Sequence, residues 1–113
     1  MTERGDVLQL RSRVGFGAGK DGERVVVVQV SELNSALPTT LVVPLDLLAD
    51  PYIDRDLLVR VPALEAGAPK ECVAIPTHLR FLRTDRFEPG RVGRLRRKTL
   101  TELDEKLRLI LDL

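Results

Sequence analysis

Three glycines and a lysine fall within residues 15–20 of the stretch GFGAGKDGERV, a pattern that could hold a phosphate. A standard phosphate-binding loop requires G-x-x-x-x-G-K-[ST] between a strand and a helix. Here the first glycine position is occupied by Val14, and Lys20 is followed by Asp21 instead of a hydroxyl residue. The stretch runs into VVVV, which is typical of a strand, so no helix N-terminus would face the phosphate. The spacing therefore excludes both the P-loop and the dinucleotide-binding loop.

The same segment carries basic side chains and an aromatic ring. Arg11, Arg13 and Lys20 surround Phe16 within ten positions. Cationic groups beside a ring suit single-stranded nucleic acid, whose phosphates and bases they can contact. The alternative is a glycine-rich hairpin loop without a ligand, with the phenylalanine tucked into the core. Both interpretations predict a mobile connection between two strands.

Charge is unevenly distributed along the chain. The formal net charge is only +1. Residues 78–98 nevertheless hold 8 Lys/Arg against 2 acidic residues. Such a segment can be a solvated face, or it can bind a polyanion or an acidic partner segment.

Composition excludes several classes of protein. With 113 residues, 43% hydrophobic and 31% charged, the sequence predicts a single domain over residues 1–113. No stretch approaches the roughly 20 apolar residues of a membrane-spanning helix, and no membrane association is expected. The single cysteine, Cys72, and single histidine, His78, match no metal-binding spacing, so no metal or cofactor is expected. A cytoplasmic location follows as an expectation.

Hydropathy predicts short strands followed by one helix. Apolar or alternating segments, separated by Gly, Pro, Asn and Asp, predict strands at residues 6–12, 24–30, 39–45, 56–63 and 71–76. Pro44 is expected to end the third strand, because proline cannot donate to a central ladder. Leu100, Leu103, Leu107 and Ile110 form one helical stripe.

The expected start of that helix is a capping box formed by Thr99 and Glu102. Strands at this spacing followed by a terminal helix predict a mainly β fold, a strongly bent sheet or small barrel covered by the helix.

The order of these features resembles the MazF/PemK toxins of bacterial toxin–antitoxin systems. RGDVLQL at residues 4–10, a glycine-rich loop ending in Arg24, a valine-rich strand and VVPL follow the family's order. HLRFLRTDRF is similar to the family's Q-I-R-T-I-D-x-x-R-[LF] segment, and LTELDEKLRLILDL is similar to its closing helix. The resemblance extends over nearly the whole chain.

The resemblance implies an SH3-like barrel of the MazF/CcdB type with a C-terminal amphipathic helix, assembled as a homodimer. It also implies a metal-independent, sequence-specific endoribonuclease that cleaves single-stranded mRNA through the 2′-OH. A cognate antitoxin would silence this activity by laying an acidic C-terminal segment into the RNA groove.

The family's catalytic arginine corresponds to Arg24, which would stabilise charge on the phosphorus centre. The alternative for Arg24 is an ion pair on the rim of the barrel. The family's Thr or Ser partner is replaced by Asp46, and its Gln by His78. Either residue could transfer the proton, although a lone histidine is more often a surface residue. Thr77 and Arg80, with Arg11, Arg13, Phe16 and Lys20, are the expected RNA contacts.

Departures from the family pattern keep other functions open. Val25 replaces the usual proline, and Ile75 and Thr77 occupy positions where some members have Arg and Asp. One alternative is a CcdB-like toxin that binds DNA gyrase, although the chain has no tryptophan and ends in Leu-Asp-Leu. The other is a barrel that retains only RNA or partner binding.

Overall fold

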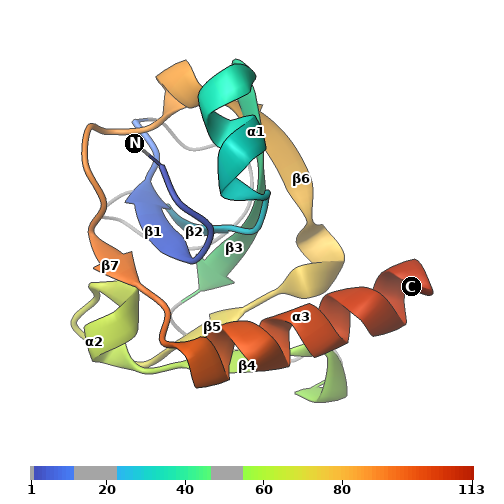
Figure 1. Cartoon of the computed structure of the whole chain (residues 1–113). Helices are drawn as coiled ribbons and strands as arrows, with labels where there is room; N and C mark the ends of the chain where they lie inside the picture. The colour runs from blue at the N-terminus through green and yellow to red at the C-terminus, as the bar shows by residue number, and fades with distance from the viewer. Residues whose placement is uncertain (1, 12–22, 47–54) are drawn as a thin grey trace.

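A curled antiparallel sheet and a C-terminal helix make up the computed structural model, which describes residues 2–11, 23–46 and 55–113 (Figure 1). Within these ranges the strands are β1 (Asp6–Gln9), β2 (Arg24–Val27), β3 (Thr39–Asp46), β4 (Val59–Val61), β5 (Cys72–Ala74), β6 (Arg80–Arg83) and β7 (Gly93–Arg94). The helices are α1 (Ser31–Ala36), α2 (Ala63–Ala66) and α3 (Arg97–Leu111), with 3-10 turns η1 (Arg55–Leu57), η2 (Pro76–His78) and η3 (Thr84–Arg86). The expected mainly β architecture with a terminal helix is confirmed.

Strand β3 is the centre of the sheet. The order is β4-β5-β3-β2-β1-β7, and β6 also pairs with β3. β6 lies along the first half of β3 (Thr39 opposite Arg83, Val42 opposite Arg80), whereas β5 lies along its last two residues. The η2 turn between β5 and β6 therefore follows one edge of β3, and β2 occupies the other edge.

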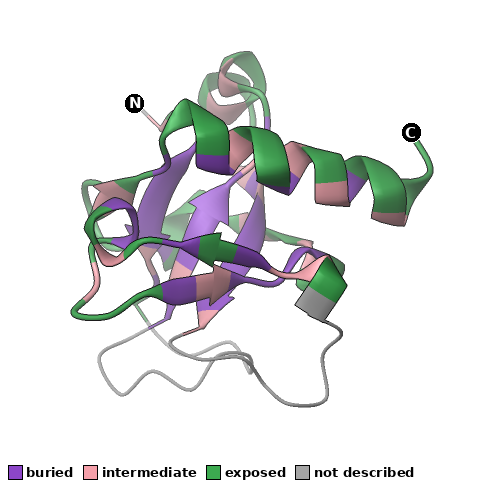
Figure 2. Cartoon of the chain, turned by 90° about the horizontal axis from the view of Figure 1, so that it is seen from below, coloured by how far each residue is buried: buried purple, intermediate pink, exposed green. Residues whose placement is uncertain are grey.

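Apolar side chains from the two faces of the sheet form two clusters. One cluster lies between the sheet and α3, and it joins Val7, Val26, Val43, Leu45 and Leu103 with residues of β4 and β5. The other covers the opposite face with Leu8, Leu10, Val25, Val27, Val42 and Phe87. Figure 2 shows buried residues continuing through the strands beneath an α3 that is exposed on its outer side. The strong hydrophobicity of β2 follows from this burial on both faces.

The apolar stripe of the C-terminal helix is confirmed. Leu103 and Leu107 are buried, and Leu100 and Ile110 are half-buried. The capping-box prediction is wrong, because α3 begins at Arg97, Arg96 is its N-cap residue and Thr99 is buried. The Arg96 amide instead donates to the Glu65 carboxylate of α2, at 2.9 Å. A carboxylate at a helix N-terminus interacts favourably with the amides there. Glu65 of α2 therefore caps α3, in place of the Thr99 and Glu102 side chains that the sequence predicted.

Several short elements differ from the expectation. β3 continues past Pro44 to Asp46, and the Pro44 carbonyl accepts the Ile75 amide at 3.0 Å. Residues 31–36, which separate two of the predicted strands, form the short helix α1. A hydrogen bond from the Gln29 side chain to the Asn34 side chain, at 2.9 Å, anchors this helix. The strands expected to extend over residues 56–63 and 71–76 are limited to the three residues of β4 and of β5. β6 and β7 were not expected, because RFLR is half charged and β7 has two residues.

Candidate functional site

Arg24 is the first residue of β2 and lies opposite Gln9 of β1 and Leu45 of β3. The residue is half-buried. Its Nε is buried and has no hydrogen-bond partner among residues 2–11, 23–46 and 55–113. A buried donor without an acceptor costs free energy, so this guanidinium is suited to a ligand that supplies acceptor oxygens.

Asp46 is the last residue of β3 and lies opposite Val73. Side chains that are directly opposite each other share a face, so Arg24 starts from the face of Leu45. Asp46 follows Leu45 by one residue and starts from the other face. The two charged residues are thus neighbours at the same end of adjacent strands, with a one-residue offset.

Cys72 reports the electrostatics of this end of the sheet. Its side chain is buried in the cluster beneath α3. Burial raises the pKa of the Cys72 thiol; the Arg24 guanidinium opposes this effect, and the carboxylates of Asp46 and Glu71 add to it. Charges on Arg24 and Asp46 therefore both influence the pKa of this one buried group.

The other residues proposed from the family segment lie along the opposite edge of β3. Thr77 and His78 are exposed in η2, and the His78 amide donates to the Ile75 carbonyl at 3.0 Å. Arg80 is exposed at the start of β6, opposite Val42. Val42 is four residues before Asp46, a separation of about 13 Å along the strand. The register therefore joins Arg24 with Asp46 and sets Arg80 well away from them.

Among the expected loop contacts, only Arg11 belongs to the described part of the chain. Its amide donates to the Arg86 carbonyl at 2.8 Å, and its Nε donates to the Phe87 carbonyl at 2.8 Å. Arg13, Phe16 and Lys20 lie outside the described residues.

Arg11 also lines a hollow between β1 and the segment that leads to β7. The hollow has a volume of about 770 Å³, and its wall includes Asp6, Glu88, Arg91 and Arg94. Sequence reasoning did not select Arg91 or Arg94 individually. The excess of basic residues over 78–98 was the signal that contained them.

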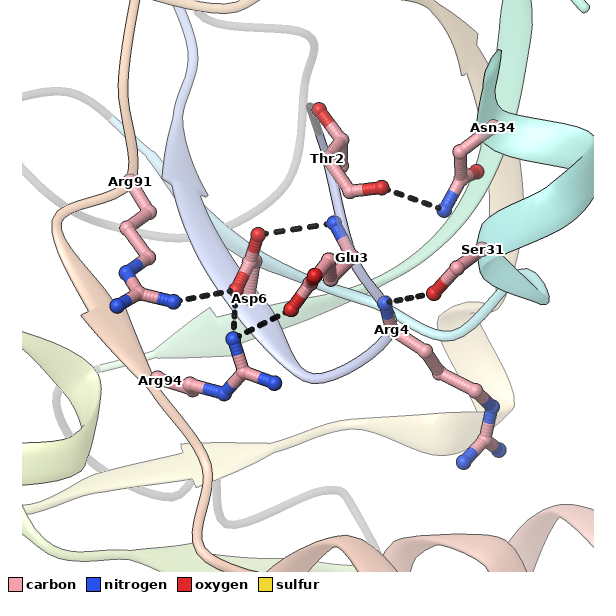
Figure 3. Close-up of polar contacts among 8 residues, drawn as sticks. All are labelled: Thr2, Glu3, Arg4, Asp6, Ser31, Asn34, Arg91 and Arg94. Carbon is pink, nitrogen blue, oxygen red and sulfur yellow. Dashed lines mark hydrogen bonds and ion pairs between the residues drawn. The ribbon is translucent and has the colours of Figure 1, made fainter. Parts of the chain in front are cut away.

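A buried carboxylate organises this hollow (Figure 3). Nη1 of Arg91 and Nη1 of Arg94 each lie 3.3 Å from Oδ1 of Asp6. The other carboxylate oxygen of Asp6, Oδ2, accepts a hydrogen bond from the Glu3 amide at 2.9 Å. Arg94 also donates to the Glu3 carboxylate at 2.8 Å. This bond lowers the pKa of Glu3 and raises that of Arg94, because it favours the charged form of both.

The described ranges contain neither a metal-binding cluster nor a membrane-spanning helix. There, no group of three His, Cys, Asp or Glu side chains is arranged to hold a metal ion. No helix in the same ranges is long and apolar enough to cross a membrane.

Solved structures with the same fold cover the whole chain. An endoribonuclease from a mycobacterial species, in complex with its cognate antitoxin, is 15% identical, with a TM-score of 0.76 over 100% of this chain and 97% of that one. A MazE–MazF structure from Deinococcus radiodurans is 21% identical, with a TM-score of 0.76 and coverage of 99% and 97%. The Mycobacterium tuberculosis toxin MazF-mt6 is 15% identical, with a TM-score of 0.75 and coverage of 96% and 97%. At these identities the likeness shows the fold.

The family follows from the sequence itself. No curated protein matches the chain. The model of the family described as PemK-like, MazF-like toxin of type II toxin–antitoxin system matches residues 3–111. That range contains every strand and helix of the described structure, as well as Arg24 and Asp46. This chain belongs to the PemK-like, MazF-like toxins of type II toxin–antitoxin systems.

Proposed function

We propose that this chain is a sequence-specific endoribonuclease that cleaves single-stranded mRNA without a metal ion and is neutralised by a cognate antitoxin. The family match supports the toxin role. One observation in the chain itself carries the proposal: Arg24, at the family's arginine position, has a buried Nε with no acceptor in the described part of the structure. A phosphodiester would supply that acceptor if the guanidinium turns outward on binding, because the Nε is enclosed in the structure.

The reaction uses the RNA's own 2′-OH as the nucleophile. The 2′ oxygen forms a bond to phosphorus, the bond from phosphorus to the 5′ oxygen breaks, and a cyclic phosphate and a free 5′-OH result. One proton must leave the 2′-OH and another must reach the departing 5′ oxygen. Arg24 would bind the phosphate oxygens and stabilise the charge that accumulates on them in the transition state.

Asp46 and His78 are the candidates for proton transfer. Asp46 is favoured by position, because it ends the strand beside Arg24 and both act on Cys72. An aspartate here would repel the phosphate, and the Arg24 charge would offset that repulsion. His78 is exposed on η2, along the other edge of β3, so it would act as an acid from that side.

A direct test is to incubate the purified protein with a long single-stranded RNA in EDTA. We expect cleavage products with a cyclic phosphate and a 5′-OH, and a loss of about 100-fold or more in rate for Arg24→Ala. Lys70→Ala, which removes an exposed cation outside residues 78–98, is the matched control and should cleave normally. No cleavage by the wild-type chain, or equal cleavage by Arg24→Ala, would contradict the proposal. Binding of RNA or of gyrase without cleavage would favour one of the two non-catalytic alternatives.

The homodimer is supported by an apolar surface around β6. Phe81 is 68% exposed and lies opposite Leu41 of β3. Leu41 and Leu79 line a second hollow of about 410 Å³, together with Leu107, Leu111 and Leu113 near the end of α3. Contiguous exposed apolar side chains are typical of a protein interface. We propose that a second copy of the chain covers this surface.

The antitoxin would be recognised by charge. Its acidic segment would compete with RNA for the same cationic side chains. The excess of Lys and Arg over acidic residues in 78–98 provides such side chains. A peptide from the antitoxin should therefore inhibit cleavage, and its affinity should fall as salt is raised.

A further inference from the structure

The hollow beside β1 has the properties of an anion site that the proposed cleavage chemistry does not use. Three arginines reach it from separate segments: Arg11 beyond the end of β1, Arg91 in the segment before β7, and Arg94 in β7. Pockets that hold a small ligand or a part of a polymer have volumes of roughly 300–1,000 Å³. At about 770 Å³, this hollow falls in that range.

Asp6 holds two of these arginines in place. The Asp6 side chain is 5% exposed, whereas those of Arg91 and Arg94 are 52% and 46% exposed. Each arginine uses Nη1 to reach the carboxylate, and no partner is found in the described ranges for Nη2 of either residue. The Asp6 carboxylate therefore orients both guanidinium groups through Nη1, as Figure 3 shows. Their Nη2 groups remain as donors for a ligand. Fixing a side chain before binding lowers the entropy cost of ordering it.

The hollow is connected through the sheet to the strand position of Arg24. Gln9, which lies opposite Arg24, accepts the Glu88 amide at 2.7 Å. The next residue, Leu10, forms a bridge with Phe87, and Arg11 follows. Since neighbouring strands are spaced by about 4.8 Å, the Glu88 backbone lies about 10 Å from that of Arg24. The hollow is lined by Asp6 and Leu8, which start from the face of β1 opposite to that of Gln9 and Arg24. A strand of RNA that bends around this end of the barrel from Arg24 would thus have its flanking nucleotides within reach of the hollow.

We infer that the hollow lined by Arg11, Arg91 and Arg94 binds phosphodiester groups of the RNA that flank the cleavage site. This inference rests on the proposed function, because it takes the ligand at Arg24 to be RNA. Arginine is suited to the role, since its planar fork matches two phosphate oxygens. Three carboxylates share the wall with the arginines. Asp6 and Glu3 offset part of the charge of Arg91 and Arg94, and the exposed Glu88 further weakens the attraction for an anion.

The test measures the binding of a labelled 2′-O-methyl RNA, which lacks the nucleophile and cannot be cleaved. Arg91→Ala should weaken binding by about 10-fold and reduce the slope of log affinity against log salt by about 1. Glu88→Gln should strengthen binding by a few fold, a gain that a misfolded variant could not produce. Lys98→Ala removes a cation from the same basic segment but outside the hollow, and should have a smaller effect than Arg91→Ala.

Three results would overturn the inference: equal losses for Arg91→Ala and Lys98→Ala, no gain for Glu88→Gln, or full competition by inorganic phosphate at millimolar concentration. The first would assign the binding to diffuse charge, and the last would assign the hollow to a free anion. Failure of the proposed function is a separate outcome, because it is detected by cleavage of unmodified RNA by Arg24→Ala.

Discussion

Arg24 and Asp46 stand at the same end of adjacent strands, offset by one residue. The offset comes from the pairing of Arg24 with Leu45, and it gives the two charged side chains different starting faces. For both groups to contact one phosphate, that phosphate would have to lie beyond the ends of β2 and β3, where side chains from the two faces can reach the same point.

This arrangement predicts separate effects for the two positions. Asp46→Asn should lower kcat by about 100-fold or more if the carboxylate accepts the 2′-OH proton. It should leave RNA affinity unchanged or higher, because it removes a negative charge near the phosphate. Single-turnover cleavage and binding of a 2′-O-methyl RNA measure the two quantities. Unchanged kcat in Asp46→Asn, with a loss in His78→Gln, would transfer the role to the histidine.

The proposed interface between two copies of the chain predicts an effect of Phe81 on assembly. Phe81→Arg places a charge in the exposed apolar surface and should convert the dimer to a monomer, as measured by light scattering coupled to size exclusion. Leu64→Arg is the matched control, because Leu64 is 79% exposed on α2 and belongs to another surface. A wild-type chain that is monomeric at high concentration would contradict the prediction, as would a Phe81→Arg variant that remains dimeric.

Close backbone packing predicts a large loss of stability at Gly93. A β-carbon there would lie 2.2 Å from the Glu65 carbonyl oxygen and 2.9 Å from the Gly67 nitrogen. Gly93→Ala should therefore lower the free energy of unfolding by about 3 kcal/mol or more, because backbone atoms must move. The Glu65 side chain also accepts a hydrogen bond from the Arg96 amide. Displacement of Glu65 by the new β-carbon would therefore also disturb the start of α3.

Gly90 provides the comparison for that experiment. It has φ +80°, but a β-carbon would meet no atom within 4 Å. Gly90→Ala should cost only about 1 kcal/mol, the strain of a left-handed conformation. Urea unfolding of both variants measures the difference, and similar losses would show that the contact at Gly93 is easily relieved.

The buried thiol predicts a dependence of stability on alkaline pH. Because burial raises the pKa of Cys72, the folded chain keeps its proton at a pH where the unfolded chain has lost it. Stability is therefore fully present below the ordinary thiol pKa and declines as pH rises above it, by at most about 1.4 kcal/mol per pH unit. Urea unfolding at several pH values should show a shallower decline for Cys72→Ala. A parallel decline in both proteins would show that other groups cause it.

The sequence by itself determined the class of the fold, and it supplied the residue on which the proposed site is built. Burial on both faces made β2 recognisable from its valines, and the 3–4 spacing of leucines identified α3, because local periodicity reflects which face is covered. Arg24 could be proposed from the sequence because the family pattern places this arginine directly after the glycine-rich loop, at the start of a strand. β6 was not predicted because its sequence, RFLR, is half charged and lacks the pattern of a strand. The segment is a strand because it pairs with β3.

Only the tertiary structure decided which distant residues meet. The start of α3 depends on Glu65, a residue 31 positions before Arg96, so no local pattern contained it. The hollow depends on Asp6 binding Arg91 and Arg94, which lie 85 and 88 positions away. The register of β2 with β3 similarly decided that Asp46, and not Arg80, is the neighbour of Arg24. Charge composition predicted a basic surface, but the shape of that surface arises from contacts that the linear order does not contain.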